Sequence, residues 1–333
     1  MQVIHPDMQL VEENVIQNYS RNLHQDKTSF FEIEMGFNKI EVFCPENKHE
    51  EIQGLLYTLI RNKPAQIKKM FSSNKKIILY YQTHLINHLD KLHLINYIEN
   101  GFFAYSLVDF FEEINGFTEV GLLDWDYFIG KDDFSVLRNT QKVALKRVSD
   151  YFHAIILIIL TLPISIITAI CIKLESAGPI FYTQTRVGQF NEEFKVIKFR
   201  SMTVNAESKG AQWAQKSDPR TTRVGKFIRK TRIDEIPQLI NVLRGEMSLI
   251  GPRPERRVFI KMLTNEIPFY EFRHSILPGI TGLAQVKYPY GASVEDGVWK
   301  HKYDLYYIRN QNFFLDVKII FMTIKTVLSG MGI

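Results

Sequence analysis

Two adjacent carboxylates, Asp234 and Glu235, lie in a strongly basic part of the chain. Lysines and arginines flank the pair on both sides in the sequence, namely Arg223, Lys226, Arg229, Lys230, Arg232, Arg244, Arg253, Arg256 and Arg257. Cations at this density could hold an anionic substrate such as a phosphate while one carboxylate attacks it. The same pattern is also typical of a solvated salt-bridge cluster, so the pair alone leaves both interpretations open.

The residues after the pair predict a helix that begins there. Apolar residues recur at helical spacing from Ile236 to Leu243, and Pro237 is tolerated only in the first turn of a helix. A helix N-terminus and nearby arginines both favour ionised carboxylates, so Asp234 could be a deprotonated nucleophile. Adjacent side chains at a helix start point about 100° apart, which predicts different roles for Asp234 and Glu235. Mg²⁺ is commonly held by one or two carboxylates and substrate phosphates, so both are candidate Mg²⁺ ligands.

Five further cations are candidates for substrate binding. Lys198 and Arg200 alternate along a short apolar strand pattern, which places both on one face of the strand as phosphate ligands. Arg253 lies between two prolines that restrict the backbone, so its guanidinium could be held in a direction suited to a phosphate; a rigid surface turn is the alternative. Arg186 and Arg232 could contribute as well, or could form packing ion pairs or bind lipid headgroups.

The composition bounds the elements that position these residues. A chain of 333 residues with 45% hydrophobic and 23% charged residues is globular and long enough for two domains. Residues 1 to 140 carry 13 Lys+Arg against 20 Asp+Glu, and residues 141 to 333 carry 28 against 16, so the second part is expected to meet anions. Cys44 and Cys171 are too few for a disulfide framework or a zinc site, which favours a reducing compartment.

The first 140 residues predict a small acidic α/β domain with a regulatory, packing or partner-binding role. The predicted strands are Lys39 to Phe43 and Lys76 to Tyr81, the predicted helices are Glu51 to Arg61, Ile86 to Glu99 and Ser106 to Ile114, and Gly121 to Arg138 is predicted to be a connecting loop. No Gly-rich phosphate motif follows either strand. The segment Met1 to Leu10 does not have the pattern of a secretory signal, so this domain is expected in the cytosol.

The stretch from Ala154 to Ile172 has no charged residue and predicts a membrane-associated segment within residues 141–175. As a helix it would be roughly 28 Å long, which is barely enough to cross a bilayer. Pro163 lies near its centre and deprives the Ile159 carbonyl of its helical partner, and basic residues flank both ends. We therefore predict a re-entrant helix with a break at Pro163; a bent spanning helix and a buried core helix are the alternatives.

A second lipid contact is predicted near the C-terminus. Its apolar residues recur at helical spacing, namely Phe313, Phe314, Val317, Ile320, Phe321, Ile324 and Leu328. This pattern predicts an interfacial amphipathic helix, and packing against the catalytic core is the alternative.

Residues from about Lys142 to the C-terminus resemble the catalytic domain of the bacterial sugar transferases, the monotopic phosphoglycosyl transferases, also called polyprenyl glycosylphosphotransferases. The matching motifs follow the apolar segment in order and are Ser176-Ala177-Gly178-Pro179, Gln184-Thr185-Arg186-Val187-Gly188, Lys198-Phe199-Arg200-Ser201-Met202, Asp218-Pro219-Arg220, Ile233-Asp234-Glu235-Ile236-Pro237-Gln238, Asn241-Val242-Leu243-Arg244-Gly245, Gly251-Pro252-Arg253-Pro254-Glu255 and Pro278-Gly279-Ile280-Thr281-Gly282. The later stretches 288–292 and 303–307 further resemble the exopolysaccharide-associated branch.

The resemblance implies a fold and a reaction. The fold is an α/β (α+β) catalytic domain over residues 176–333 with a re-entrant membrane helix and interfacial amphipathic helices. The reaction moves a sugar 1-phosphate from a UDP-sugar to polyprenyl (undecaprenyl) phosphate and releases UMP, which starts exopolysaccharide or other lipid-linked glycan assembly. Asp234 would form the covalent phosphosugar intermediate, Glu235 would support Mg²⁺ and the leaving phosphate, and Arg253 would bind the nucleotide diphosphate or the lipid phosphate.

The resemblance also implies partners and a location. The protein would bind membrane phospholipid at the cytosolic face of the bacterial inner (cytoplasmic) membrane, with a homodimer and downstream glycan-assembly enzymes as further partners and no nucleic acid. One departure from the family pattern is that Leu162 precedes Pro163, where many relatives have serine. Two other functions remain open, a nucleotide-sugar-binding scaffold without turnover and a glycosyltransferase that releases UDP.

Overall fold

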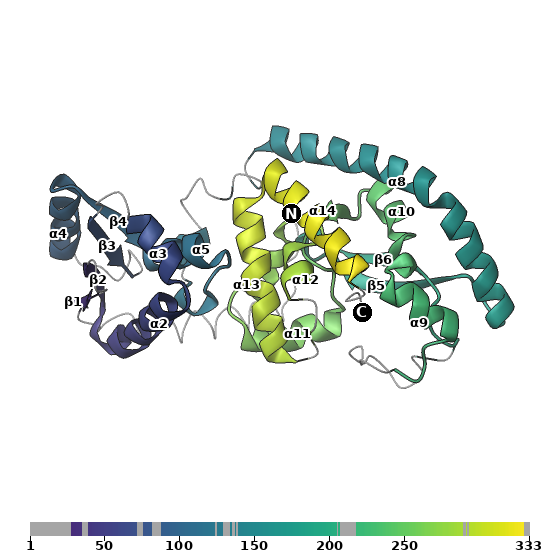
Figure 1. Cartoon of the computed structure of the whole chain (residues 1–333), viewed down its shortest axis with the longest axis horizontal. Helices are drawn as coiled ribbons and strands as arrows, with labels where there is room; N and C mark the ends of the chain where they lie inside the picture. The colour runs from purple at the N-terminus through teal and green to yellow at the C-terminus, as the bar shows by residue number, and fades with distance from the viewer. Residues whose placement is uncertain are drawn as a thin grey trace, which may run out of the picture. The chain divides into compact units, whose positions relative to one another are not determined.

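The computed structural model describes residues 28–34, 39–71, 76–81, 88–123, 125–128, 134, 137, 139–204, 206, 218–288, 291 and 293–329. The chain forms two compact units, Met1–Lys131 and Asp132–Ile333 (Figure 1). The segment Met1 to Leu10, the start of the helix predicted from Ile86 and half of the loop predicted from Gly121 to Arg138 lie outside the described residues. The described half of that loop contains the end of the 3₁₀ turn η3 Val120–Leu122 and the short helix α6 Trp125–Phe128.

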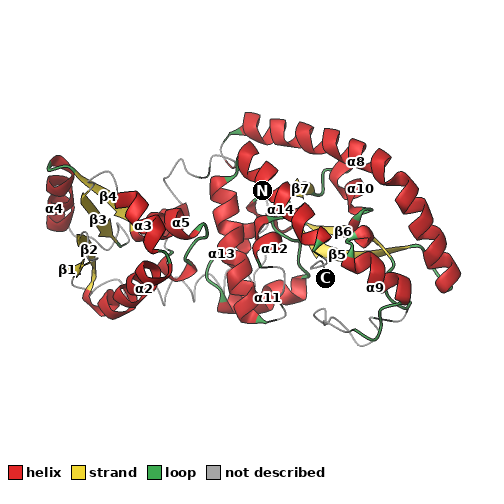
Figure 2. Ribbon diagram, in the orientation of Figure 1, coloured by secondary structure: helices red, strands yellow, loops and turns green. Residues whose placement is uncertain are grey.

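The first unit contains a four-stranded sheet in the order β1-β2-β3-β4 (Figure 2). Its strands are β1 Thr28–Glu34, β2 Lys39–Pro45, β3 Lys76–Tyr80 and β4 Phe102–Ser106, and its longer helices are α2 His49–Asn62, α3 Pro64–Phe71, α4 His88–Glu99 and α5 Leu107–Asn115. Strand β1 pairs antiparallel with β2, whereas β2, β3 and β4 are parallel and are joined by helical crossovers. The predicted strands correspond to β2 and β3, and the predicted helices to α2, α4 and α5; β1, β4 and α3 were not predicted.

The second unit is a mixture of helices and short strands built on one long helix. Its described elements are α8 Thr140–Glu175, β5 Phe181–Val187, β6 Glu193–Phe199, α9 Arg223–Lys230, the 3₁₀ turn η5 Ile233–Glu235, α10 Gln238–Leu243, β7 Ser248–Ile250, α11 Arg257–Glu266, the 3₁₀ segment η6 Tyr270–Ser275, β8 Gly279–Thr281, α12 Leu283–Lys287, α13 Val294–Asn310 and α14 Phe313–Leu328. Strands β5 and β6 form an antiparallel hairpin, and β7 pairs in parallel with β8.

Helix α8 continues through Pro163, so the predicted break is absent. Figure 1 shows the helix as a long curved rod. Thr161 donates its hydroxyl to the Leu157 carbonyl at 2.7 Å, one turn earlier in the helix. It therefore does not bond to the Ile159 carbonyl, which loses its helical partner because Pro163 has no amide hydrogen. In the most apolar 18-residue stretch of α8, only 11% of the residues are buried. The helix is long and apolar enough to cross a membrane. The buried core helix is therefore the wrong alternative, and a membrane-inserted helix agrees with the structure.

One side of α8 holds the elements that carry the candidate site. In the first half of the helix, Ala154 packs in a core cluster with Leu239 and Val242 of α10. Near its end, Ile172 packs with Phe199 of β6 and with α9. The same helix thus has an exposed apolar face and a buried stripe that supports β6, α9 and α10.

Helix α14 also divides into two faces. Asp316, Ile319 and Thr326 are buried, whereas the predicted apolar face is largely exposed, with Phe314 at 81% and Phe321 at 68%. Packing on the core therefore uses the other face of the helix. The outward face has the composition of an interfacial helix.

Candidate active site

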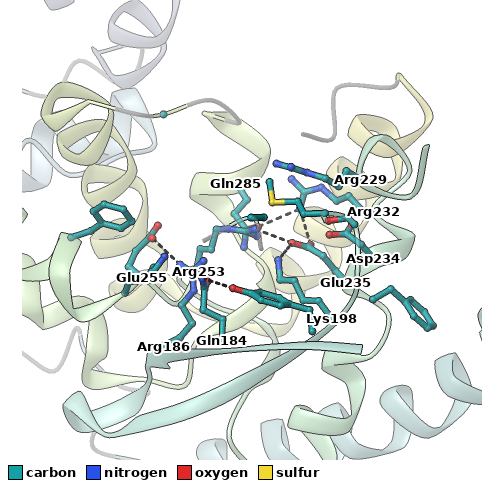
Figure 3. A pocket seen from close by; sticks show the side chains of 18 of the residues that line it. Gln184, Arg186, Lys198, Arg229, Arg232, Asp234, Glu235, Arg253, Glu255 and Gln285 are labelled. Atoms are coloured by element: carbon teal, nitrogen blue, oxygen red, sulfur yellow. Dashed lines mark hydrogen bonds and ion pairs between the residues drawn. The ribbon is translucent and has the colours of Figure 1, made fainter. Parts of the chain in front are cut away.

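A pocket of about 680 Å³ lies in the second unit. All the candidate residues from the sequence line it, namely Asp234, Glu235, Lys198, Arg200, Arg232, Arg253 and Arg186. Figure 3 shows most of them pointing toward a common centre from β5, β6, η5 and the turn after β7. Segments up to 69 residues apart in the sequence contact one another here, as Arg186 and Glu255 do.

A tight turn presents the two carboxylates. Arg232 adopts a left-handed backbone conformation with φ of 56°, which reverses the chain between α9 and η5. Ile233 and Ile236 pack against the core cluster beside α8, so the carboxylates between them turn to the pocket. The structure places Asp234 and Glu235 in the 3₁₀ turn just before α10, which begins after Pro237.

Glu235 is surrounded by cations. Lys198 Nζ and Arg253 Nη2 both donate to Glu235 Oε1, at 3.0 and 2.8 Å, and Arg232 Nη1 lies 3.6 Å from Oε2. Burial by itself would raise the pKa of Glu235, but the charges of Arg253, Lys198 and Arg232 outweigh burial and hold that pKa well below its usual value. Glu235 is therefore an ionised, charge-neutralised carboxylate.

Asp234 has a different environment although it is the next residue. Its side chain is buried, and it forms no hydrogen bond or ion pair with any residue that the structure describes. Burial and, to a smaller extent, the negative charge of Glu235 raise the pKa of Asp234 to about 6, against the opposing charge of Lys198. The expected effect of the arginines therefore dominates the pKa of Glu235, whereas burial dominates that of Asp234, because the cations contact its neighbour.

Gln285 is a site residue that the sequence analysis missed. Its Oε1 accepts hydrogen bonds from Arg253 Nη1 at 2.9 Å and from Arg232 Nη1 at 3.3 Å, so one amide orients two guanidinium groups (Figure 3). Its Nε2 is buried without a partner among the described residues. A Cβ at Gly279 would overlap the backbone of Gly251, so this close approach of β7 and β8 needs glycine and brings Gln285 beside Arg253. The glycine-rich motif just before α12, residues 278–282, was the sequence feature that could have pointed to Gln285.

Arg200 has contacts that differ from those of a phosphate ligand. Its guanidinium donates to the carbonyls of Ser176 and Ala177, both at 2.8 Å, and to the Ser176 hydroxyl at 3.0 Å. These oxygens follow the C-terminal end of α8, where helical carbonyls lack intrahelical partners. Arg200 therefore fixes the end of α8 at the edge of the pocket.

Arg186 and Arg273 support the backbone around Arg253. Arg186 donates to the Pro254 carbonyl at 3.2 Å and to Glu255 at 3.3 Å, which matches the packing ion pair named as an alternative for it. Arg273 is buried, pairs with Asp304 at 2.8 Å and donates to the Arg253 carbonyl at 3.1 Å. The position of the Arg253 guanidinium thus depends on both proline restriction and tertiary contacts.

Comparisons with known proteins agree with this site. The profile of the family described as bacterial sugar transferase matches residues 141–330. A UDP-N-acetylgalactosamine-undecaprenyl-phosphate N-acetylgalactosaminephosphotransferase of Aeromonas hydrophila is 53% identical over 188 residues, which cover 56% of this chain and 44% of that protein. A UDP-glucose:undecaprenyl-phosphate glucose-1-phosphate transferase of Klebsiella pneumoniae is 40% identical over 215 residues, covering 64% of this chain and 44% of that protein.

A shorter relative matches over more of its own length. It is a UDP-glucose:undecaprenyl-phosphate glucose-1-phosphate transferase of Caulobacter vibrioides, 39% identical over 186 residues, which cover 55% of this chain and 70% of that protein. The chain spans less than half of the length of the Aeromonas and Klebsiella relatives. Since the family profile covers more than half of this chain, including every residue of the site described above, the protein belongs to the bacterial sugar transferase family.

Proposed function

We propose that this protein transfers a sugar 1-phosphate from a UDP-sugar to a polyprenyl phosphate, such as undecaprenyl phosphate, and releases UMP. The observation that carries the proposal is the contrast between Glu235, neutralised by Lys198 and Arg253, and the neighbouring Asp234, which has no such partner among the described residues. An unpaired carboxylate beside clustered cations can attack an anionic phosphate, because the cations offset the repulsion. The relatives from Aeromonas hydrophila and Klebsiella pneumoniae are undecaprenyl-phosphate sugar phosphate transferases, which supports the same acceptor.

The transfer has two steps. An Asp234 oxygen attacks the phosphorus that bears the sugar, and the bond from that phosphorus to the UMP oxygen breaks, which leaves an acyl phosphate on Asp234. An oxygen of the polyprenyl phosphate then attacks the same phosphorus, the acyl phosphate bond breaks, and the Asp234 carboxylate is regenerated. Lys198, Arg232 and Arg253 hold the phosphates and stabilise the charge that develops on their oxygens.

Mg²⁺ is the proposed cofactor, with Asp234 and Glu235 as its protein ligands. Glu235 Oε2 is buried and accepts no hydrogen bond from the described residues, so it is an oxygen with capacity for a hard cation. No group of three or more His, Cys, Asp or Glu side chains gathers within the described part of the chain, so substrate phosphates and water would complete the coordination. When bound, Mg²⁺ would polarise the phosphate under attack.

The acceptor phosphate would be reached from the membrane surface. Apolar residues of α8 and α14 are exposed, as a lipid-facing surface requires. UDP-sugars are charged and water-soluble, so the pocket must also open to the cytosol. We therefore place the protein on the cytosolic face of the inner membrane, where both substrates can meet.

The decisive test measures the released nucleotide and the covalent adduct. Purified protein incubated with polyprenyl phosphate and UDP-N-acetylgalactosamine or UDP-glucose should release UMP. Release of UDP would instead support transfer of the sugar alone, and binding without nucleotide release would support a scaffold. With donor alone, digestion and mass spectrometry should find a sugar phosphate on Asp234.

The Asp234→Asn variant separates binding from chemistry. It should lose UMP release while donor binding persists, because the positioning cations remain when the nucleophile is removed. Glu193→Gln is a matched control, since Glu193 pairs with Arg257 at 3.1 Å and does not line the pocket. Turnover by Asp234→Asn above about one tenth of the wild-type rate contradicts the covalent assignment.

A further inference from the structure

The pocket extends beyond the phosphate-binding cations to a pair of opposite charges, Glu255 and Lys300. We propose that these two side chains form a subsite for vicinal hydroxyl groups on a ring of the donor, either the sugar or the ribose. This inference rests on the proposed function and adds to it a second polar subsite, which binds hydroxyl groups instead of phosphates.

Glu255 retains capacity to accept hydrogen bonds. Its side chain is 16% exposed, lines the pocket and pairs with Arg186 through Oε2 at 3.3 Å. Its other oxygen, Oε1, accepts no hydrogen bond from the described residues. Burial alone would raise the pKa of Glu255, but the charges of Arg186 and Lys300 lower it, so an ionised acceptor remains available.

Lys300 supplies donors to the same region. It lies on the face of α13 that lines the pocket, together with Asp296 and Gly297, and Ser293 just before the helix lines the pocket as well. Its ammonium forms no hydrogen bond or ion pair with the described residues, although burial lowers its pKa and the charge of Glu255 opposes that change. The ammonium therefore has three donors for a ligand.

The pairing of charges selects the ligand chemistry. A phosphate would gain from Lys300 but would be repelled by Glu255. A hydroxyl group suits both, because it donates to a carboxylate and accepts from an ammonium. Asp296, the other carboxylate in this part of the pocket, is already engaged by Ser293 and by Tyr288.

The subsite has a defined relation to the reacting carboxylates. Glu255 follows Arg253 by two residues, and Arg186 contacts both the Pro254 carbonyl and Glu255. In Figure 3 the Arg253 side chain lies between Glu255 and Glu235. A donor whose phosphates contact Arg253 can therefore extend a ring toward Glu255 and Lys300.

Binding measurements in the Asp234→Asn background test this subsite without turnover. Isothermal titration with UDP-N-acetylgalactosamine, UDP-glucose, UDP and pyrophosphate would be compared for Glu255→Gln, Lys300→Met and the parent. Matched controls are Glu193→Gln and Lys302→Met; neither residue lines the pocket, and Lys302 lies 4.6 Å from the centre of the Trp299 ring. Thermal unfolding of each variant checks the fold.

We expect Glu255→Gln and Lys300→Met to weaken UDP-sugar binding about 10- to 100-fold, with pyrophosphate binding changed less than about threefold. If UDP binding is unchanged, the ring is the sugar; if UDP weakens equally, the ring is the ribose. Unchanged UDP-sugar binding in both folded variants would overturn the inference, as would an equal loss for pyrophosphate. Failure of wild-type UMP release would refute the proposed reaction alone, because the binding comparison does not depend on it.

Discussion

Asp234 and Glu235 are neighbours with opposite electrostatic environments. Lys198 and Arg253 both contact Glu235 Oε1, whereas Asp234 is buried beside them without a direct partner among the described residues. The negative charge is therefore held firmly on Glu235, and Asp234 is the group whose protonation changes near neutrality. This asymmetry suits a nucleophile beside a metal ligand.

The pH dependence of the reaction should report Asp234. Its pKa is raised to about 6, mainly by burial, and only the ionised form can attack, so activity is retained above this pKa and lost below it. We expect the rate of adduct formation with donor alone to fall about tenfold per pH unit below about pH 6. Rapid-quench mass spectrometry would measure it, with Glu193→Gln as a control. A constant rate between about pH 5 and 8 contradicts this role for ionised Asp234.

Gln285 should affect catalysis through the two arginines that it orients. In Gln285→Met the acceptor for Arg253 and Arg232 is lost, and we expect kcat/KM to fall about 10- to 100-fold, with donor KM rising. Gln285→Glu retains an acceptor and should recover part of that loss. Gln189→Met is the control, because the Gln189 amide donates to the Ser275 carbonyl outside the pocket. Equal kinetics for the Gln285 variants and the control would show that orientation by this amide is unimportant.

Helix α8 is the element that combines an exposed apolar face with support for the site. Before its uncharged stretch, Asp150 accepts a hydrogen bond from Ser248 at 2.6 Å. At its other end, Glu175 accepts from the Arg223 amide at 2.7 Å, and Arg200 contacts the Ser176 carbonyl. A helix that crossed a bilayer of roughly 30 Å would separate these ends, and the same catalytic unit could not contact both.

Accessibility labelling tests this geometry. Cysteines at Ser149 and Ser176, in a chain with Cys44→Ala and Cys171→Ser, should react with a membrane-impermeant maleimide from the same face of sealed inverted vesicles. The same face is expected because Ser149 is next to Asp150, which bonds to Ser248, and Ser176 itself contacts Arg200. Reaction from opposite faces would establish a spanning helix and contradict the shared-face arrangement. A single cysteine replacing Glu193 in that background marks the face of the catalytic unit.

At the scale of the whole molecule, the candidate reaction belongs to one unit. Every residue that lines the pocket lies within Asp132–Ile333, and the family profile matches residues 141–330. This part also carries the basic charge, which attracts anionic substrates. The acidic first unit contributes a separate sheet with its own buried residues, such as Ile40 and Ile78.

A chain truncated to residues 132–333 should therefore keep the reaction. We expect its kcat for UMP release to remain within about threefold of the full chain, because the pocket and its supporting helices are retained. The comparison uses equal amounts of detergent-solubilised protein and includes Asp234→Asn of the truncated chain as the inactive control. Loss of activity in a folded truncated protein would assign the first unit a role in catalysis.

Several features could be predicted from local sequence. The alternation of apolar residues located β2 and β3, and helical periodicity located α2, α4 and α5. The uncharged stretch from Ala154 to Ile172 indicated α8, and the Asp-Glu pair within a basic region identified the centre of the candidate site. These properties depend on residues that are close together in the chain, so a short window contains the necessary information.

Other features required the tertiary structure. The two cations that contact Glu235 Oε1 come from positions 37 and 18 residues away. Burial by distant segments raises the pKa of Asp234, against the effect of the nearby cations. Gln285 can accept a hydrogen bond from Arg253 only because β7 and β8 approach closely. Arg200 contacts the Ser176 carbonyl because folding brings the end of α8 beside β6. Composition and spacing thus determined which chemical groups are present and which secondary structure each segment favours. Folding decided which of these groups meet and how strongly water is excluded from them, because contacts between distant segments and burial depend on the packed chain as a whole.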